Sequence, residues 1–181
     1  MKIMYKKYKI NNQQNAINGF TLIELLLYIG LLVLFIGVAT TFILGFMETK
    51  AKNNTIVDVE EQGTFASRLI GQTLRNATSI NSPSQGTTAT SLSINTYDPA
   101  KTPTLFDLSG GAIRMKEGSG AYINLTNTNV TITNLTFSNL SRANTPGVIK
   151  YQFTVTYINP DSRNVYDFEK TFYQSASLRK K

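Results

Sequence analysis

The sequence predicts an α+β protein in which one long N-terminal helix is followed by a small antiparallel β-sheet. Three observations support this fold class. An apolar run without proline extends from Gly19 to Met47, a helical stripe of apolar residues continues beyond it, and strand-like runs follow Pro83. The 181 residues suit one folded domain together with a helical anchor.

The first 19 residues are basic and then rich in asparagine and glutamine, which is typical of a targeting segment. Their four lysines supply four of the seven net positive charges, so no nucleic-acid-binding domain is expected in the rest of the chain. Lysines before an apolar run favour a cytoplasmic N-terminus and an external C-terminal domain. Two alternatives are an uncleaved anchor and a secretory signal peptide, although a signal peptide has an apolar region of only about 7–15 residues.

The run from Phe20 to Met47 is long enough to cross a membrane. As a helix it measures about 42 Å at roughly 1.5 Å per residue, whereas a bilayer core needs about 20 residues. Besides Tyr28 it contains one ionisable side chain, Glu24. A carboxylate inside a membrane span costs roughly 2.5–3.5 kcal/mol even on lenient scales, so Glu24 needs an explanation.

Two different faces are expected on this helix at about 100° per residue. One face carries Glu24, Tyr28 and three phenylalanines, at positions 35, 42 and 46. The far side carries small residues, namely Gly30, Gly37 and Thr41, with Gly45 further round. The series Gly37-x3-Thr41-x3-Gly45 is of the small-xxx-small type that lets helices approach closely in lipid, although glycine and aromatic residues are also common in membrane helices generally.

Beyond Met47 the apolar residues form a stripe, which predicts a helix over roughly 20–79 with an amphipathic outer half. The stripe consists of Ala51, Thr55, Val59, Ala66, Leu69, Ile70, Thr73, Leu74 and Ala77. Gly63 and Gly71 each weaken this half by about 1 kcal/mol relative to alanine, so it needs a partner surface.

After a Ser/Thr/Gly/Pro loop at 81–90, seven runs have strand character. They are Ser91–Thr96, Thr104–Leu108, Ala112–Lys116, Ala121–Leu125, Val130–Phe137, Val148–Ile158 and Val165–Ser175. In Val148–Ile158, apolar Tyr151, Phe153 and Val155 alternate with polar residues, which predicts one buried and one wet sheet face. The helical stripe is the expected cover for the buried face.

Residues Gly19-Phe20-Thr21-Leu22-Ile23-Glu24 resemble the prepilin processing motif of type IV pilins and type II secretion pseudopilins. The resemblance implies a pilin-like fold, cleavage between Gly19 and Phe20 by a prepilin peptidase/methyltransferase, N-methylation of Phe20, and assembly into a filament. More loosely, Arg68–Ile80 and the later VTITNLTF run resemble J-type minor pseudopilins and related minor pilins. The chain departs from major pilins because it lacks their cysteine pair, has Thr41 where many have proline, and has Asn18 where a basic residue is usual.

Glu24 allows two interpretations. Cleavage would create an α-amino group on Phe20, and Glu24 of one subunit could pair with that cation on a neighbour, which would fix the axial register. Alternatively, Glu24 reaches the membrane interface from about one turn inside the helix and interacts with the positive end of the helix dipole. The surrounding motif favours the pairing, with Gly30, Gly37, Thr41 and Gly45 as further assembly residues.

No catalytic group, metal site or cofactor is predicted. The sequence has no cysteine and no histidine, which excludes disulfides, a lipoprotein anchor, thiol and imidazole chemistry, and the commonest zinc ligands. Four aspartates (Asp98, Asp107, Asp161 and Asp167) lack the spacing of a calcium loop and are expected in turns and on the surface. The glycines of Ser109-Gly110-Gly111 and Gly118-Ser119-Gly120 are expected to form tight turns.

The sequence therefore predicts a single-pass protein of the bacterial cytoplasmic membrane that assembles with other pilin or pseudopilin subunits into a cell-surface or periplasmic filament. Its expected parts are a leader (1–19), a membrane half (20–47) and an amphipathic half (48–80) of the helix, and a sheet domain (81–181). The alternative function is a membrane-anchored extracellular binding protein that does not polymerise. A minor pilin that takes up DNA has little support, because the chain without its leader has a net charge of only +3.

Overall fold

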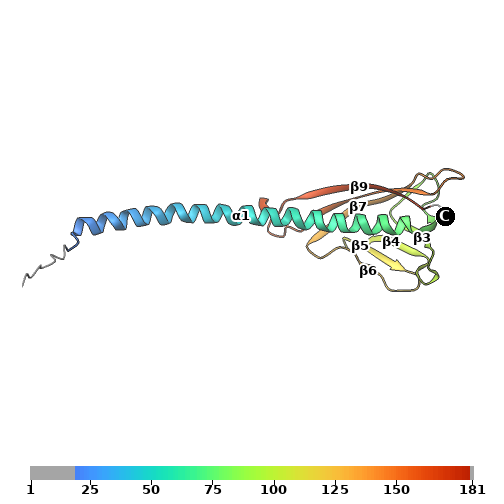
Figure 1. Ribbon diagram of the computed structural model, residues 1–181, viewed down its shortest axis with the longest axis horizontal. Coiled ribbons are helices and arrows are strands. Elements are labelled where there is room, and N and C mark those ends of the chain that lie inside the picture. Colours follow the sequence, from blue (N-terminus) through green and yellow to red (C-terminus); the bar gives the residue numbers. More distant parts are fainter. Residues whose placement is uncertain (1–18, 180–181) are drawn as a thin grey trace, which may run out of the picture. The chain divides into compact units, whose positions relative to one another are not determined.

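The computed structural model describes residues 19–179 (Figure 1). They belong to two compact units, which divide between Leu44 and Gly45. The helix α1, Leu22–Arg75, contributes its first part to the N-terminal unit and its remainder to the second. The predicted leader lies outside the described residues except for Gly19.

The second unit contains two antiparallel sheets rather than the single small sheet that the sequence predicted. The five-stranded sheet has the order β1 (Ala77–Ser82), β3 (Leu92–Thr96), β4 (Thr104–Ser109), β5 (Ala112–Glu117) and β6 (Ile123–Asn124). The four-stranded sheet has the order β2 (Thr88–Ala89), β7 (Val130–Asn139), β8 (Val148–Tyr157) and β9 (Glu169–Ser177). Two short 3-10 helices, η1 (Pro99–Lys101) and η2 (Asn164–Tyr166), lie in the connections.

The predicted end of the helix near residue 79 is wrong. The helix ends at Arg75, and Ala77 begins β1, which pairs with β3 through Ala77↔Thr96 and Ile80↔Ile94. Ala77 continues the helical spacing of the stripe and is indeed buried, but it is buried as a strand residue. The pairing with β3 decides the outcome, and such a long-range pairing leaves no signal in the local pattern.

Six of the seven predicted strands are confirmed within two residues at each end, and the last differs more. The expected strand at 121–125 shrinks to Ile123–Asn124, and the last strand begins at Glu169 because η2 occupies part of the predicted run. The two-residue strand β2, in the predicted 81–90 loop, was not foreseen. The glycine turns are confirmed: Gly110 and Gly111, with φ of +59° and +75°, join β4 to β5, and Gly118 has a φ of +52°.

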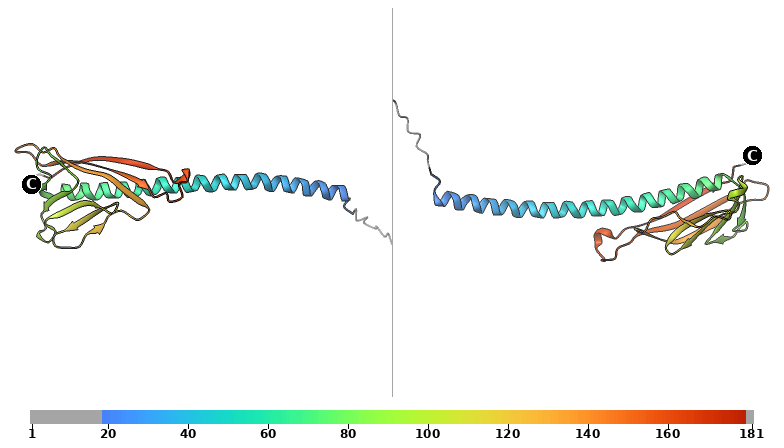
Figure 2. Two further views of the ribbon diagram at one scale, coloured as in Figure 1. Left: turned by 180° about the vertical axis from the view of Figure 1, so that it is seen from behind. Right: turned by 90° about the horizontal axis from the view of Figure 1, so that it is seen from below.

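The second half of α1 covers both sheets along the line where they meet. In Figure 1 the strands β7 and β9 are seen on one side of the helix and β3 to β6 on the other, while in the right-hand view of Figure 2 both sets lie on the same side of it. One hydrophobic core joins the three layers. Its members include Val59, Ala66, Ile70 and Leu74 from the helix, Leu92, Ile94, Phe106 and Ile113 from the first sheet, and Ile132, Phe137, Tyr151, Phe153 and Val155 from the second.

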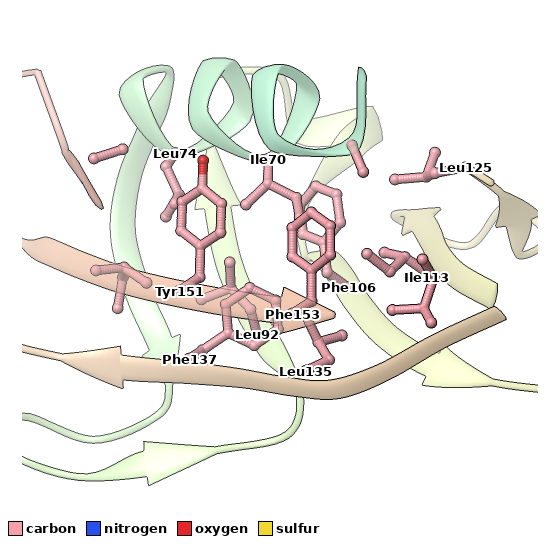
Figure 3. Packing of buried hydrophobic residues seen from close by; sticks show 14 of the residues in the cluster. Ile70, Leu74, Leu92, Phe106, Ile113, Leu125, Leu135, Phe137, Tyr151 and Phe153 are labelled. Atoms are coloured by element: carbon pink, nitrogen blue, oxygen red, sulfur yellow. The ribbon is translucent and has the colours of Figure 1, made fainter. Parts of the chain in front are cut away.

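The predicted cover of the buried sheet face is therefore confirmed. Figure 3 shows Ile70 and Leu74 directed from the helix toward Tyr151 and Phe153 of β8. The Tyr151 hydroxyl reaches the helix itself and donates a hydrogen bond of 2.7 Å to the carbonyl oxygen of Ser67. This buried bond ties the sheet to the second half of the helix.

Gly63 and Gly71 lie where aromatic rings of the sheet approach the helix backbone. A Cβ atom built on Gly63 would overlap the ring of Phe172, and one on Gly71 would lie 3.1 Å from the Tyr151 hydroxyl. Phe172 in turn stacks on Phe153, with ring centroids 5.6 Å apart. The two glycines thus exchange some helix stability for close packing on the sheet, which is the partner surface that this half of the helix was expected to need.

Candidate functional site

The Gly19–Glu24 motif, which resembles the prepilin processing motif, lies at the N-terminal end of α1. Thr21 precedes the first helical residue, and its hydroxyl oxygen accepts a hydrogen bond from the backbone N–H of Glu24, at 3.3 Å. The carbonyl oxygen of Thr21 accepts from the N–H of Leu25, at 3.1 Å. Thr21 is therefore an N-cap residue, and Thr21-x-x-Glu24 has the spacing of a capping box.

Glu24 also has a side-chain partner within the helix. The hydroxyl of Tyr28, one turn later, donates to Glu24 Oε1 at 3.4 Å. The ring of Tyr28 meets that of Phe20 edge to face, with centroids 5.7 Å apart. Phe20, Glu24 and Tyr28 consequently form a local cluster at the start of the helix.

This cluster does not neutralise the carboxylate. None of the ion pairs among the described residues involves Glu24. A long hydrogen bond from one phenol cannot replace a cation if the group is moved into lipid, where an unpaired charge is expensive. A further partner for Glu24 must come from water, from the membrane interface or from another molecule.

The predicted small-residue series lies on open helix surface. A Cβ atom built on Gly30, Gly37 or Gly45 would meet no atom of residues 19–179 within 4 Å, apart from its own stretch of helix backbone. The Thr41 hydroxyl donates to the carbonyl oxygen of Val38 at 2.8 Å, so its polarity is satisfied inside the helix. Unlike Gly63 and Gly71, these glycines pack against no other part of the described chain.

The large apolar side chains between Leu22 and Met47 are also uncovered. Phe42 is 78% exposed and Phe35 is 70% exposed. The best 18-residue window of α1 has a mean hydropathy of 2.6 and no buried residue, so by length and composition the helix can cross a membrane. An apolar surface of this size needs cover from lipid or protein.

The aspartates considered as cation ligands are scattered through the second unit. Asp98 caps η1 by accepting from the N–H of Ala100, and Asp107 forms a two-fold hydrogen-bonded ion pair with Arg114. Asp161 and Asp167 are exposed. Within residues 19–179 no three histidine, cysteine, aspartate or glutamate side chains gather in a way that could hold a metal ion.

Two side chains of the second unit have shifted pKa values for structural reasons. Burial raises the pKa of Tyr151 to about 12, against an opposing effect of the Arg75 charge. The hydrogen bond to Asp107 raises the pKa of Arg114, which also lies over the ring of Tyr122. Both shifts favour the protonated forms that the observed contacts use.

The structure thus brings together Phe20 and Glu24 among the predicted site residues and leaves Gly19, Gly30, Gly37, Thr41 and Gly45 without neighbours from elsewhere in the described chain. Sequence reasoning missed Thr21 and the Tyr28 hydroxyl. The Thr-x-x-Glu spacing could have indicated the first, and the i, i+4 spacing of Glu24 and Tyr28 the second. Comparisons of the chain with protein-family models, curated proteins and solved structures found no match.

Proposed function

We propose that this chain is a prepilin-like minor pilin or pseudopilin subunit. It is processed after Gly19 and assembles into a filament like a type IV pilus or a type II secretion pseudopilus. The observation that carries the proposal is that the Gly19–Glu24 motif directly begins a helix whose apolar segment has no cover from residues 19–179. The cover is lipid before assembly and the helices of other subunits afterwards.

The unpartnered glycines favour assembly over simple anchoring. A glycine in a helix interior costs about 1 kcal/mol relative to alanine, and Gly30, Gly37 and Gly45 give no packing against the rest of the described chain in return. Close approach of a second helix along this face would use them. An anchored binding protein that never polymerises has no such use for this face.

In this proposal Glu24 fixes the axial position of one subunit's helix relative to the next. Cleavage leaves a cationic amine on Phe20, about 6 Å along the axis from Glu24 at 1.5 Å per residue. Parallel helices staggered along their axes can place the amine of one subunit against the carboxylate of the next. A buried carboxylate is tolerated when paired in this way, and the pairing selects one stagger among many.

Processing is tested by the intact mass of the protein extracted from membranes of cells with a prepilin peptidase. The expected mass corresponds to a chain that begins at Phe20 and carries one additional methyl group. A strain without the peptidase provides the control and should yield the full chain. Full-length protein that keeps Met1 in the peptidase-containing strain would contradict the proposal and favour the anchored binding protein.

A further inference from the structure

A groove lies between the second half of α1 and strand β9. Its walls are helix residues between Glu60 and Arg75, the consecutive residues 170–175 of β9, and Tyr151. All of these belong to the second unit. The groove is separate from the apolar segment and from the Gly19–Glu24 motif.

Strand β9 presents an open edge to this groove. It is the last strand of its sheet and pairs with β8 alone. Side chains alternate between the two faces of a strand, so a wall on one face would contain every second residue. Because consecutive residues line the groove, its wall is the backbone edge, where alternate N–H and C=O groups lack a strand partner.

The groove is also positively charged. Lys170 pairs with Glu60 at one end. Arg68 and Arg75 lie two turns apart on the same side of the helix, are exposed, and take part in none of the ion pairs found among residues 19–179. The charge of Arg75 also acts on Tyr151, another residue of the groove wall. Two guanidinium groups are therefore available to an anion lying in the groove.

A buried hydroxyl without a partner belongs to the same wall. Ser67 is 7% exposed, and its Oγ has no hydrogen-bond partner among the described residues. Buried hydroxyls in folded proteins are normally satisfied. The groove wall thus contains an unused polar group as well as unpaired backbone and unpaired arginines.

We infer that this groove binds an extended acidic segment of a partner protein, which adds to β9 as a further strand and directs carboxylates toward Arg68 and Arg75. Strand addition uses the open backbone edge for affinity and the side-chain charges for selection. A second copy of this chain is a poor occupant, because none of its described strands carries more than one carboxylate. The inference holds whether or not the chain assembles into a filament.

The spacing of the two arginines suits such a segment. Seven helical residues separate their Cα atoms by about 10.5 Å along the axis. Alternate residues of a strand lie about 6.6 Å apart and every fourth residue about 13 Å apart. Long, flexible arginine side chains can reach either pair, so carboxylates at alternate positions of a peptide can meet both.

The probe is a fluorescent peptide, Thr-Glu-Thr-Glu-Thr-Glu-Thr, added to the full chain in detergent micelles and followed by anisotropy. We expect binding that weakens with salt, about tenfold weaker binding for the double variant R68Q/R75Q, and no binding of the peptide with lysine in place of glutamate. The variant K116Q/R142Q removes the same charge elsewhere and should bind as the wild type does. Equal affinities of the two double variants would overturn the inference.

Two N-methylated peptides distinguish binding by strand addition from binding by charge attraction alone. Methyl groups on the glutamate nitrogens block one edge of the peptide strand, and methyl groups on the threonine nitrogens block the other. An added strand uses one edge only, so one peptide should lose binding and the other should keep most of it. Equal binding of the two peptides would contradict strand addition.

Disulfide trapping locates the peptide, because the natural chain has no cysteine. A cysteine-containing peptide should trap on Q174C in the groove wall and not on K116C in the five-stranded sheet. Trapping on both variants to the same extent would show that the peptide does not select the groove. A different result would be that the peptide does not bind, while the chain self-associates and R68Q/R75Q abolishes this self-association. The occupant of the groove would then be a second copy of the chain, and the inference of an acidic partner segment would be wrong.

Discussion

Tyr151 connects the sheet to the helix through a single buried polar contact. Its side chain is 2% exposed, and its hydroxyl donates to the Ser67 carbonyl oxygen inside the core. A buried hydrogen bond of this kind contributes about 1 kcal/mol net, and leaving one partner unsatisfied costs about 1–3 kcal/mol. The hydroxyl therefore matters more to the second unit than its one bond suggests.

Replacing Tyr151 with phenylalanine should lower the free energy of unfolding of the second unit by about 1–2 kcal/mol at neutral pH, since the Ser67 carbonyl loses its tyrosine donor. Urea unfolding followed by near-ultraviolet circular dichroism measures the change. An unchanged urea midpoint at pH 7 would show that the bond is not stabilising.

The same variant isolates a pH effect. The folded pKa of Tyr151 is about 12 and its ordinary value is 10, so the unfolded chain ionises first. The stabilisation is complete below about pH 10 and is lost as the pH rises toward about 12. The stability gap between wild type and Y151F should therefore shrink over this interval. A constant gap between pH 9 and pH 12 would contradict the burial of the hydroxyl.

At the scale of the elements, the helix contains two kinds of glycine. Gly63 is in contact with a ring of the sheet, whereas Gly37 faces open space. The obstructing ring, Phe172, is itself stacked on Phe153 and has the Lys170 ammonium over its face at 5.3 Å. It cannot move aside without loss of these contacts.

Gly63→Ala should destabilise the second unit by about 1–3 kcal/mol through overpacking, which exceeds the helix propensity it gains. Gly37→Ala is the matched control and should leave the unfolding of this unit unchanged. Both are measured by urea unfolding in detergent micelles. Equal midpoints for the two variants would mean that the contact with Phe172 is not limiting.

The elements differ in how well sequence could predict them. Alternation in Val148–Ile158 predicted the inward residues of β8, and the helical stripe predicted the covering face, because each pattern depends on local periodicity. The end of α1 and the strands β1 and β2 could not be predicted in this way, since β1 depends on β3 and β2 on a strand about 50 residues later (Thr88↔Ser138). The groove beside β9 was missed for the same reason, because its helix wall and strand wall are distant in sequence.

The residues of the candidate assembly site could be identified from local sequence, but their partners could not. Gly19, Phe20 and Glu24 were identifiable from a contiguous motif, and the structure adds the local contacts of Thr21 and Tyr28. No pattern within one chain indicates which molecule meets Gly30 or Gly37. Their role is a property of an assembly and stays a prediction.

At the scale of the whole molecule, the chain has an apolar segment that none of the described residues covers and a second unit with its own hydrophobic core. The segment contains one carboxylate, Glu24, and the assembly proposal depends on that charge. If Glu24 pairs with the Phe20 amine of a neighbour, Glu24→Gln removes the attraction and keeps the size of the side chain. Breaking a buried pair costs roughly 3–5 kcal/mol, and the cost recurs at every subunit of a filament.

The most direct measurement is crosslinking between neighbouring helices in cells that express the partner subunits. A photoactivatable crosslinking residue in place of Leu34 reacts with any helix beside it, and position 34 lies on the same helix face as Thr41 at about 100° per residue. We expect illumination to crosslink the chain with Glu24 intact and the Glu48→Gln control to a neighbouring subunit, but not the Glu24→Gln variant, which should still insert and be cleaved. Crosslinked, filament-associated Glu24→Gln protein at the level of the chain with Glu24 intact would contradict the account and make Glu24 an interfacial carboxylate only.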